Sequence, residues 1–137
     1  MPLVVTLVAC NDLRDFRGTW QGARVGDAPV LVVGPGDAAT LEIDALDGHG
    51  LHATLAVDNL LPATELVSLP GAEADALSDL TFAGSPLRVF LAFVAVPDGG
   101  GDAMAIVALY DDHRVELRIL RGGTKPLYAI YQLGSER

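Results

Sequence analysis

Hydrophobic and polar residues alternate along most of the chain after Gly18. In the segment 40–46, Leu41, Ile43 and Ala45 share one face, and the Thr, Glu and Asp that precede them share the other. A period of two is that of a β-strand with one buried face. Ten such segments are predicted, at 18–25, 28–33, 39–46, 51–58, 64–69, 77–83, 87–96, 103–110, 114–121 and 126–133.

Short runs of Gly and Asp separate these segments, as in Asp47–Gly50 and Asp98–Asp102. Such runs are typical of hairpin turns. Parallel pairing would need connections of a dozen or more residues, so the strands are expected to pair antiparallel. We therefore predict an all-β fold, an antiparallel up-and-down meander that closes into a barrel of eight to ten strands. One domain over residues 18–137 suits a chain of this length.

Two predicted strands, 89–96 and 103–110, are apolar on both faces. Since a strand of a lone barrel has one face toward water, the outer face here needs a cover, either the N-terminal segment or a second copy in a homodimer. The alternative is a sandwich strand with scattered surface Ala and Val. The segment 114–121 alternates instead, and Arg114, Glu116 and Arg118 are expected on its solvated face.

Composition and charge exclude several classes of protein. Half of the residues are hydrophobic and 20% are charged, which excludes a disordered chain. The net charge of −9 argues against binding to nucleic acid or to an anionic membrane surface. A single cysteine rules out an intramolecular disulfide framework and a Cys-rich zinc site.

Signs of catalysis are missing from the sequence. The serines lie outside any Gly-x-Ser-x-Gly elbow, and Gly99–Gly101 lacks the Lys and the helix of a phosphate-binding loop. His49, His52 and His113 fall in predicted turns or on a solvated strand face. We expect no catalytic residue, no metal site and no cofactor, and hence not an enzyme.

The segment Leu7-Val8-Ala9-Cys10 resembles the lipobox of bacterial lipoproteins. The resemblance implies that Cys10 carries a lipid, that residues 1–10 are a signal remnant, and that 11–17 form a short linker. It also implies a lipid-anchored protein of the bacterial cell envelope that contacts the membrane only through this anchor. The alternative is an N-terminal strand with Cys10 in the core, which is compatible with a cytoplasmic protein.

The segment Gly18-Thr19-Trp20 resembles the Gly-x-Trp opening of lipocalins, fatty-acid-binding proteins and lipocalin-like bacterial proteins. In that family the Trp begins the first strand and plugs one end of the barrel, and an Arg from the late strands lies across the indole. The resemblance thus implies that Trp20 closes the barrel, with Arg118 or Arg121 as the arginine.

The interior of such a barrel is either filled by side chains or holds one small ligand. The expected function is non-enzymatic binding of a small hydrophobic ligand, oriented by a tyrosine hydroxyl, because almost no inward residue is charged. The alternative is a solid interaction domain that homodimerises or binds a protein through its apolar outer strands. The predicted lumen residues are Leu41, Ile43, Leu55, Phe90, Phe93, Ile106, Leu117, Ile119, Tyr128 and Tyr131.

Overall fold

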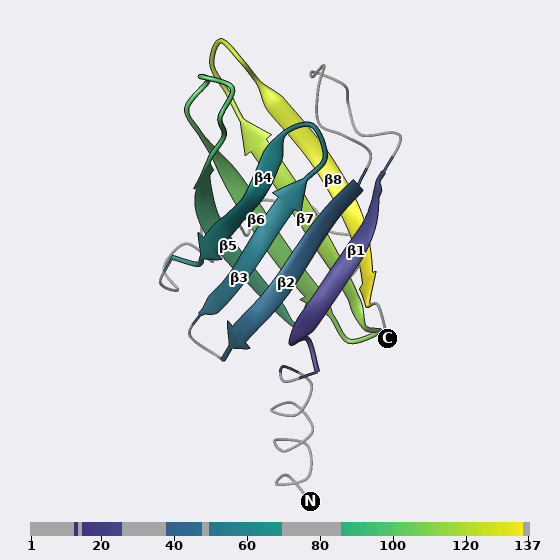
Figure 1. Cartoon of the computed structure of the whole chain (residues 1–137). Coiled ribbons are helices and arrows are strands. Elements are labelled where there is room, and N and C mark those ends of the chain that lie inside the picture. Colours follow the sequence, from purple (N-terminus) through teal and green to yellow (C-terminus); the bar gives the residue numbers. More distant parts are fainter. Residues whose placement is uncertain (1–12, 14, 26–37, 48–49, 70–85, 136–137) are drawn as a thin grey trace, which may run out of the picture.

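The computed structural model describes residues 13, 15–25, 38–47, 50–69 and 86–135 (Figure 1). The described residues form one sheet of eight strands. The strands are β1 (Gly18–Arg24), β2 (Ala38–Leu46), β3 (Leu51–Val57), β4 (Leu61–Val67), β5 (Arg88–Ala95), β6 (Asp102–Tyr110), β7 (Arg114–Arg121) and β8 (Leu127–Ser135).

The strands follow the order β4-β3-β2-β1-β8-β7-β6-β5, and every bonded neighbour is antiparallel. Figure 1 shows the sheet curling round a common interior until its two edge strands, β4 and β5, face each other. The predicted all-β meander and barrel are therefore confirmed. The predicted strands 28–33 and 77–83, and Cys10, lie outside the described residues.

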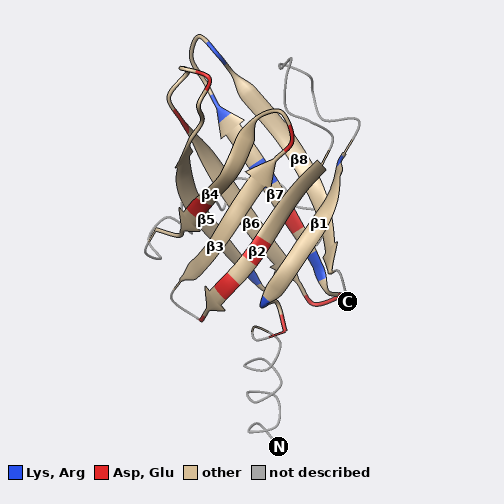
Figure 2. Ribbon diagram, in the orientation of Figure 1, with Lys and Arg blue, Asp and Glu red and all other residues tan. Residues whose placement is uncertain are grey.

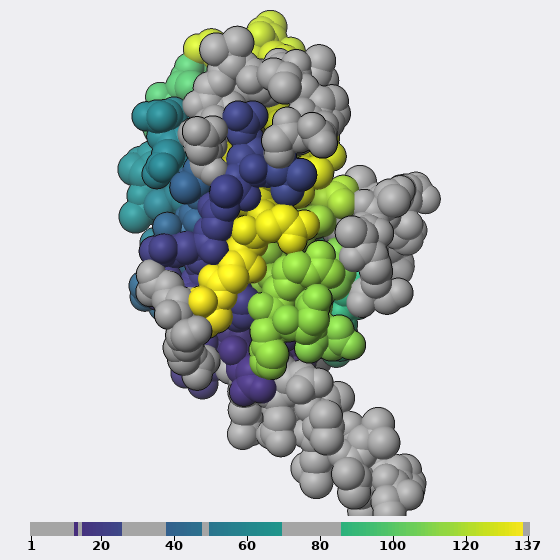
Figure 3. Space-filling view, turned by 90° about the vertical axis from the view of Figure 1, so that its right-hand side faces the viewer, coloured from purple at the N-terminus to yellow at the C-terminus, as the bar shows by residue number. Residues whose placement is uncertain are grey.

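The first and last strands join the two halves of the sheet. Gly22 of β1 pairs with Leu133 of β8, and Figure 3 shows the two strands side by side on one face of the molecule. A Cβ atom on Gly22 would lie 1.8 Å from the carbonyl oxygen of Gln132. The close approach of the β8 backbone thus requires glycine at this position.

Inward side chains of all eight strands form one hydrophobic cluster. The barrel has two ends. The Trp20 end is where β1 begins, β8 ends and the β6–β7 turn lies; the remote end holds the β3–β4, β5–β6 and β7–β8 turns. Leu41, Leu55 and Leu117 lie deep in the cluster and are fully buried. The core therefore lies in the space that the sheet encloses.

The outer face of β6 is also buried. Ile106, Ala108 and Tyr110 alternate with the inward residues of this strand and are 0–2% exposed within the single chain. Ile106 belongs to a second apolar cluster with Leu91, and partly buried Leu69 packs against it. Within the single chain, the outer face of β6 is thus largely buried, whereas Phe93 on the outer face of β5 is half exposed.

The expectation of a solvated outer face on β7 is wrong. Glu116 and Arg118 are only 3% and 8% exposed, and Arg118 Nε donates a hydrogen bond to Glu116 Oε2 at 2.9 Å. A buried charge is tolerated when it is paired and hydrogen-bonded. The alternation correctly predicted that these residues share one face of the strand. Because they are charged, that face was expected to be solvated, but it is buried. β7 carries Arg114, Glu116, Arg118 and Arg121, and Figure 2 shows basic and acidic positions along this strand.

Candidate functional site

The inner wall of the barrel is the candidate site, and most of its predicted residues lie there. They are buried on inward positions of five strands and belong to the main hydrophobic cluster. These residues are Leu41, Ile43, Leu55, Phe90, Leu117, Ile119 and Tyr131.

Three predicted lumen residues lie on the outside of the barrel, which corrects the prediction. Phe93 is half exposed, Ile106 belongs to the outer cluster, and Tyr128 alternates with buried Leu127 and Ala129. Phe93 is three residues from inward Phe90, and Tyr128 is three residues from inward Tyr131. An odd spacing places two residues of a regular strand on opposite faces.

Trp20 is held at its end of the barrel by a neighbour in sequence. Its indole Nε1–H donates a hydrogen bond to the carbonyl oxygen of Phe16 at 2.8 Å, and the two rings stack with their centroids 5.4 Å apart. Both side chains are buried in the core. Phe16 lies in the segment 11–17 that was expected to be a linker, so the described part of that segment contributes to the domain.

The two arginines expected across the indole lie elsewhere, which corrects that expectation. Arg118 pairs with Glu116 on the outer face of β7. Arg121 ends β7 at the remote end, the opposite end from Trp20. The aromatic ring of Phe16 occupies the place beside Trp20 that a cation was expected to take.

Arg121 instead clamps two turns together at the remote end. Its Nη1 and Nη2 donate to Asp98 Oδ1 and Oδ2 at 3.0 and 2.6 Å, and its Nε donates to the carbonyl oxygen of Lys125 at 2.8 Å. Hydrogen bonds from Arg121 and from the backbone N–H of Gly100 lower the pKa of Asp98 to about 2. The fork geometry of guanidinium suits such a two-pronged contact. The clamp fixes the β5–β6 turn to the β7–β8 turn.

Side-chain size differs between the two halves of the inner wall. Aromatic and large aliphatic groups lie at the Trp20 end, among them Phe16, Trp20 and Phe90. Ala53 is an exception at that end. Toward the remote end, Val, Leu and Ile positions are interspersed with the smallest residues. Those small residues are Gly22, Ala39, Ala103, Ala105 and Ala129.

Sequence reasoning missed one polar residue of the inner wall. Arg24 lies on the same face of β1 as Trp20, and it pairs in register with the fully buried Tyr131 of β8. The Nε atom of Arg24 is buried. The signal was present, because a residue four positions after Trp20 on a strand shares its face. Arg24 and Tyr131 therefore bring hydrogen-bonding groups to an otherwise apolar wall.

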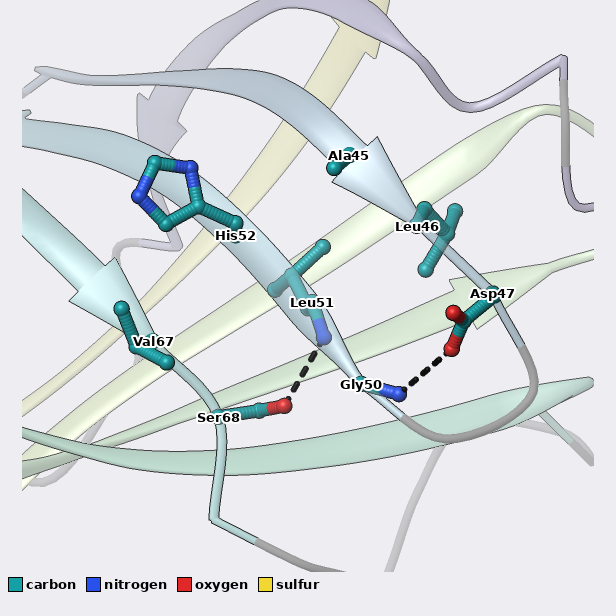
Figure 4. Close-up of a pocket in the computed structure, with 8 residues that line it drawn as sticks. All are labelled: Ala45, Leu46, Asp47, Gly50, Leu51, His52, Val67 and Ser68. Atoms are coloured by element: carbon teal, nitrogen blue, oxygen red, sulfur yellow. Dashed lines mark hydrogen bonds between the residues drawn. The ribbon is translucent and has the colours of Figure 1, made fainter.

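An open pocket of about 340 Å³ lies where β2 ends, β3 begins and β4 ends (Figure 4). Two of its polar side chains, Ser68 and Asp47, already accept hydrogen bonds from the backbone. Ser68 Oγ accepts a hydrogen bond from Leu51 N–H at 2.8 Å, and Asp47 Oδ1 accepts one from Gly50 N–H at 3.0 Å. These groups stabilise the turn, which leaves little chemistry for a ligand.

Two further open pockets lie at the barrel ends. One of about 310 Å³ is lined by Asp15, Trp20, His113 and Ser135, and one of about 430 Å³ follows the β3–β4 hairpin. Trp20 is almost fully buried, and the other three residues that line the first pocket have polar side chains.

His52 is the histidine with carboxylate partners on adjacent strands. Its Nδ1 lies 3.4 Å from Asp44 Oδ2 and its Nε2 lies 3.3 Å from Glu65 Oε2. The carboxylates lie at opposite edges of the imidazole, so one metal ion cannot bind all three groups. Among the described residues, no three His, Cys, Asp or Glu side chains are grouped to hold a metal.

In the part of the chain that the structure describes, no helix has the length and apolar character needed to cross a membrane. No protein-family model, no curated protein and no solved structure matches this chain.

Proposed function

We propose that the barrel binds one small hydrophobic ligand and catalyses no reaction. The carrying observation is the size gradient of the inner wall, with bulky rings at the Trp20 end and Gly or Ala at several inward positions toward the remote end. An eight-stranded barrel has room for its own side chains or for one small molecule. The side chains on the remote half of the wall are smaller. This half is therefore better suited to holding a small molecule than to being filled by its own side chains.

The ligand that suits this wall is apolar over most of its length. Its polar end would be oriented by the hydroxyl of Tyr131 and by Arg24, which lie opposite each other on β8 and β1. The inward side chains are buried in this conformation. Binding therefore requires the ligand to separate two strands of the barrel or to displace side chains of the inner wall.

Titration with the fluorescent apolar probe N-phenyl-1-naphthylamine tests the proposal. The parent protein should bind one probe per chain, and Ala129→Leu, which narrows the inner wall, should weaken binding at least tenfold. The matched control is Ala23→Leu, since Ala23 is exposed on the outer face of β1. Equal affinities for the three proteins, or no saturable binding by the parent, would contradict the proposal.

A second candidate function is docking of a second copy of this chain. The observation that favours it is the exposure of large apolar side chains on or beside the edge strands, with Val67 53%, Leu87 41% and Phe93 50% exposed. Light scattering at micromolar concentration should then report a dimer that Phe93→Ser converts to a monomer. A monomeric parent protein eliminates this candidate.

We also propose that Cys10 is the site of lipid attachment in the bacterial envelope, on the lipobox resemblance alone. Intact mass measurement of protein extracted from host membranes tests this. An acylated N-terminal Cys10 is expected, and unmodified Cys10 within a chain that retains Met1 would contradict it.

A further inference from the structure

The wall of the barrel has one junction without a ladder. Each of the other neighbouring strand pairs is joined by an antiparallel register, which a bulge or irregularity interrupts once between β2 and β3 and once between β3 and β4. Between the described residues of β4 and β5, no such register is formed, and the two edges are tied by the N–H of Leu69 donating to the carbonyl oxygen of Leu91 at 2.8 Å. We call this junction the β4–β5 seam.

The side chains along the seam are apolar on both faces. Extending the antiparallel register from Leu69 and Leu91 places Val67 opposite Phe93, and both are half exposed on the outside. On the inside, Leu66 of β4 and Ala92 of β5 belong to the main core. These four side chains therefore present no charged group to an apolar molecule that would pass between the two strands.

Opening the seam costs less than opening any laddered junction. A backbone hydrogen bond contributes about 0.5–1.5 kcal/mol net, and parting two laddered strands would break several of them. The two ends of the barrel are held as well, by the Phe16–Trp20 stack at one end and by the Arg121–Asp98 clamp at the other. The clamp also holds the β5–β6 turn, so β4, which is laddered only to β3, is the strand that can move.

We propose that the β4–β5 seam is the route by which an apolar ligand reaches the barrel interior, through outward movement of β4. This inference rests on the proposed ligand-binding function. The inference adds to that function a route through the side of the barrel, on which the ligand first contacts Val67 and Phe93.

A reversible staple across the seam tests the route. Val67→Cys and Phe93→Cys are combined in a Cys10→Ser background, and neighbouring antiparallel strands have the spacing that a disulfide needs. The association rate of N-phenyl-1-naphthylamine is measured by stopped-flow fluorescence before and after reduction. If the pair does not oxidise, a short bis-maleimide reagent supplies the staple. The matched control staples Gln21→Cys to Thr40→Cys, outward partners across the laddered β1–β2 junction.

The stapled seam should slow association at least tenfold, reduction should restore the rate, and the control staple should change it less than twofold. An unchanged rate with the seam stapled would overturn the route while leaving ligand binding intact. If neither the parent protein nor the reduced variant binds the probe, the proposed function fails, and the route fails with it.

Discussion

The indole Nε1–H of Trp20 donates a hydrogen bond of 2.8 Å to the backbone carbonyl oxygen of Phe16, and the side-chain rings of the two residues stack 25° from parallel. Phe16, which lies two residues before β1, is thus held on Trp20, the first core residue of this strand. This contact spans four residues, and it lies at the end of the barrel where Trp20 pairs with Ser135 of β8.

Removing the Phe16 ring should therefore destabilise the whole domain. Phe16→Ala should lower the free energy of unfolding by about 3–5 kcal/mol, because it leaves a cavity against Trp20. Urea denaturation measures this, with exposed Asp15→Ala as the control that should stay within about 0.5 kcal/mol of the parent. A loss below about 1 kcal/mol for Phe16→Ala would show that the stack does not hold this end of the barrel.

Gly22 should tolerate no side chain. Gly22→Ala should cost at least about 3 kcal/mol, the range of severe single mutations, because its Cβ would collide with the β8 backbone at Gln132. Gly134→Ala is the matched control on β8, where an added Cβ meets nothing within 4 Å. Thermal unfolding followed by circular dichroism compares them, and similar midpoints for the two variants would contradict the β1–β8 packing.

The buried pair of Glu116 and Arg118 should show strong coupling. Glu116→Leu alone should cost about 3–5 kcal/mol, because it leaves the guanidinium of Arg118 buried without its carboxylate. The double variant Glu116→Leu/Arg118→Met should recover most of that loss. Unfolding free energies of the two single variants and the double variant give the coupling energy. Additive losses would mean that the two side chains do not depend on each other.

The clamp at Asp98 should make stability depend on pH in the acid range. The pKa of Asp98 is lowered from 3.8 to about 2 in the folded chain, so its contribution is complete above pH 4 and is lost as the pH falls toward 2. Asp98→Asn removes the charge. The difference in urea midpoint between the parent and this variant should therefore shrink from pH 5 to pH 2, and a constant difference would contradict the clamp.

Alternation identified the barrel because a period of two determines the face of each residue wherever a strand is regular. It failed at Ala45, which is exposed after a bulge that shifts the β2–β3 register between Ile43 and Ala45. The lumen prediction also failed at Phe93 and Tyr128, which were assigned to the interior because of their residue type. Their odd spacing from their inward neighbours places them on the outer face.

The sequence alone could not predict the contacts between turns. Arg121 and Asp98 are 23 positions apart and meet only because the β5–β6 and β7–β8 turns lie at the same end of the barrel. Trp20, which the family resemblance singled out, is buried in the core, but the ring of Phe16 and not an arginine stacks on it. The Arg24–Tyr131 pairing follows from the β1–β8 register, which a sequence does not reveal.

The most direct test of room at the remote end compares the stability of two buried alanine-to-leucine variants. Ala53→Leu lies at the packed Trp20 end and should cost about 1–3 kcal/mol of unfolding free energy, as overfilling does in a close-packed core. Ala129→Leu lies on the small-residue half and should cost less than about 0.5 kcal/mol or raise stability, since the room proposed there would accept the larger side chain. Equal losses in urea denaturation would show that both halves are solid and would contradict the proposed ligand site.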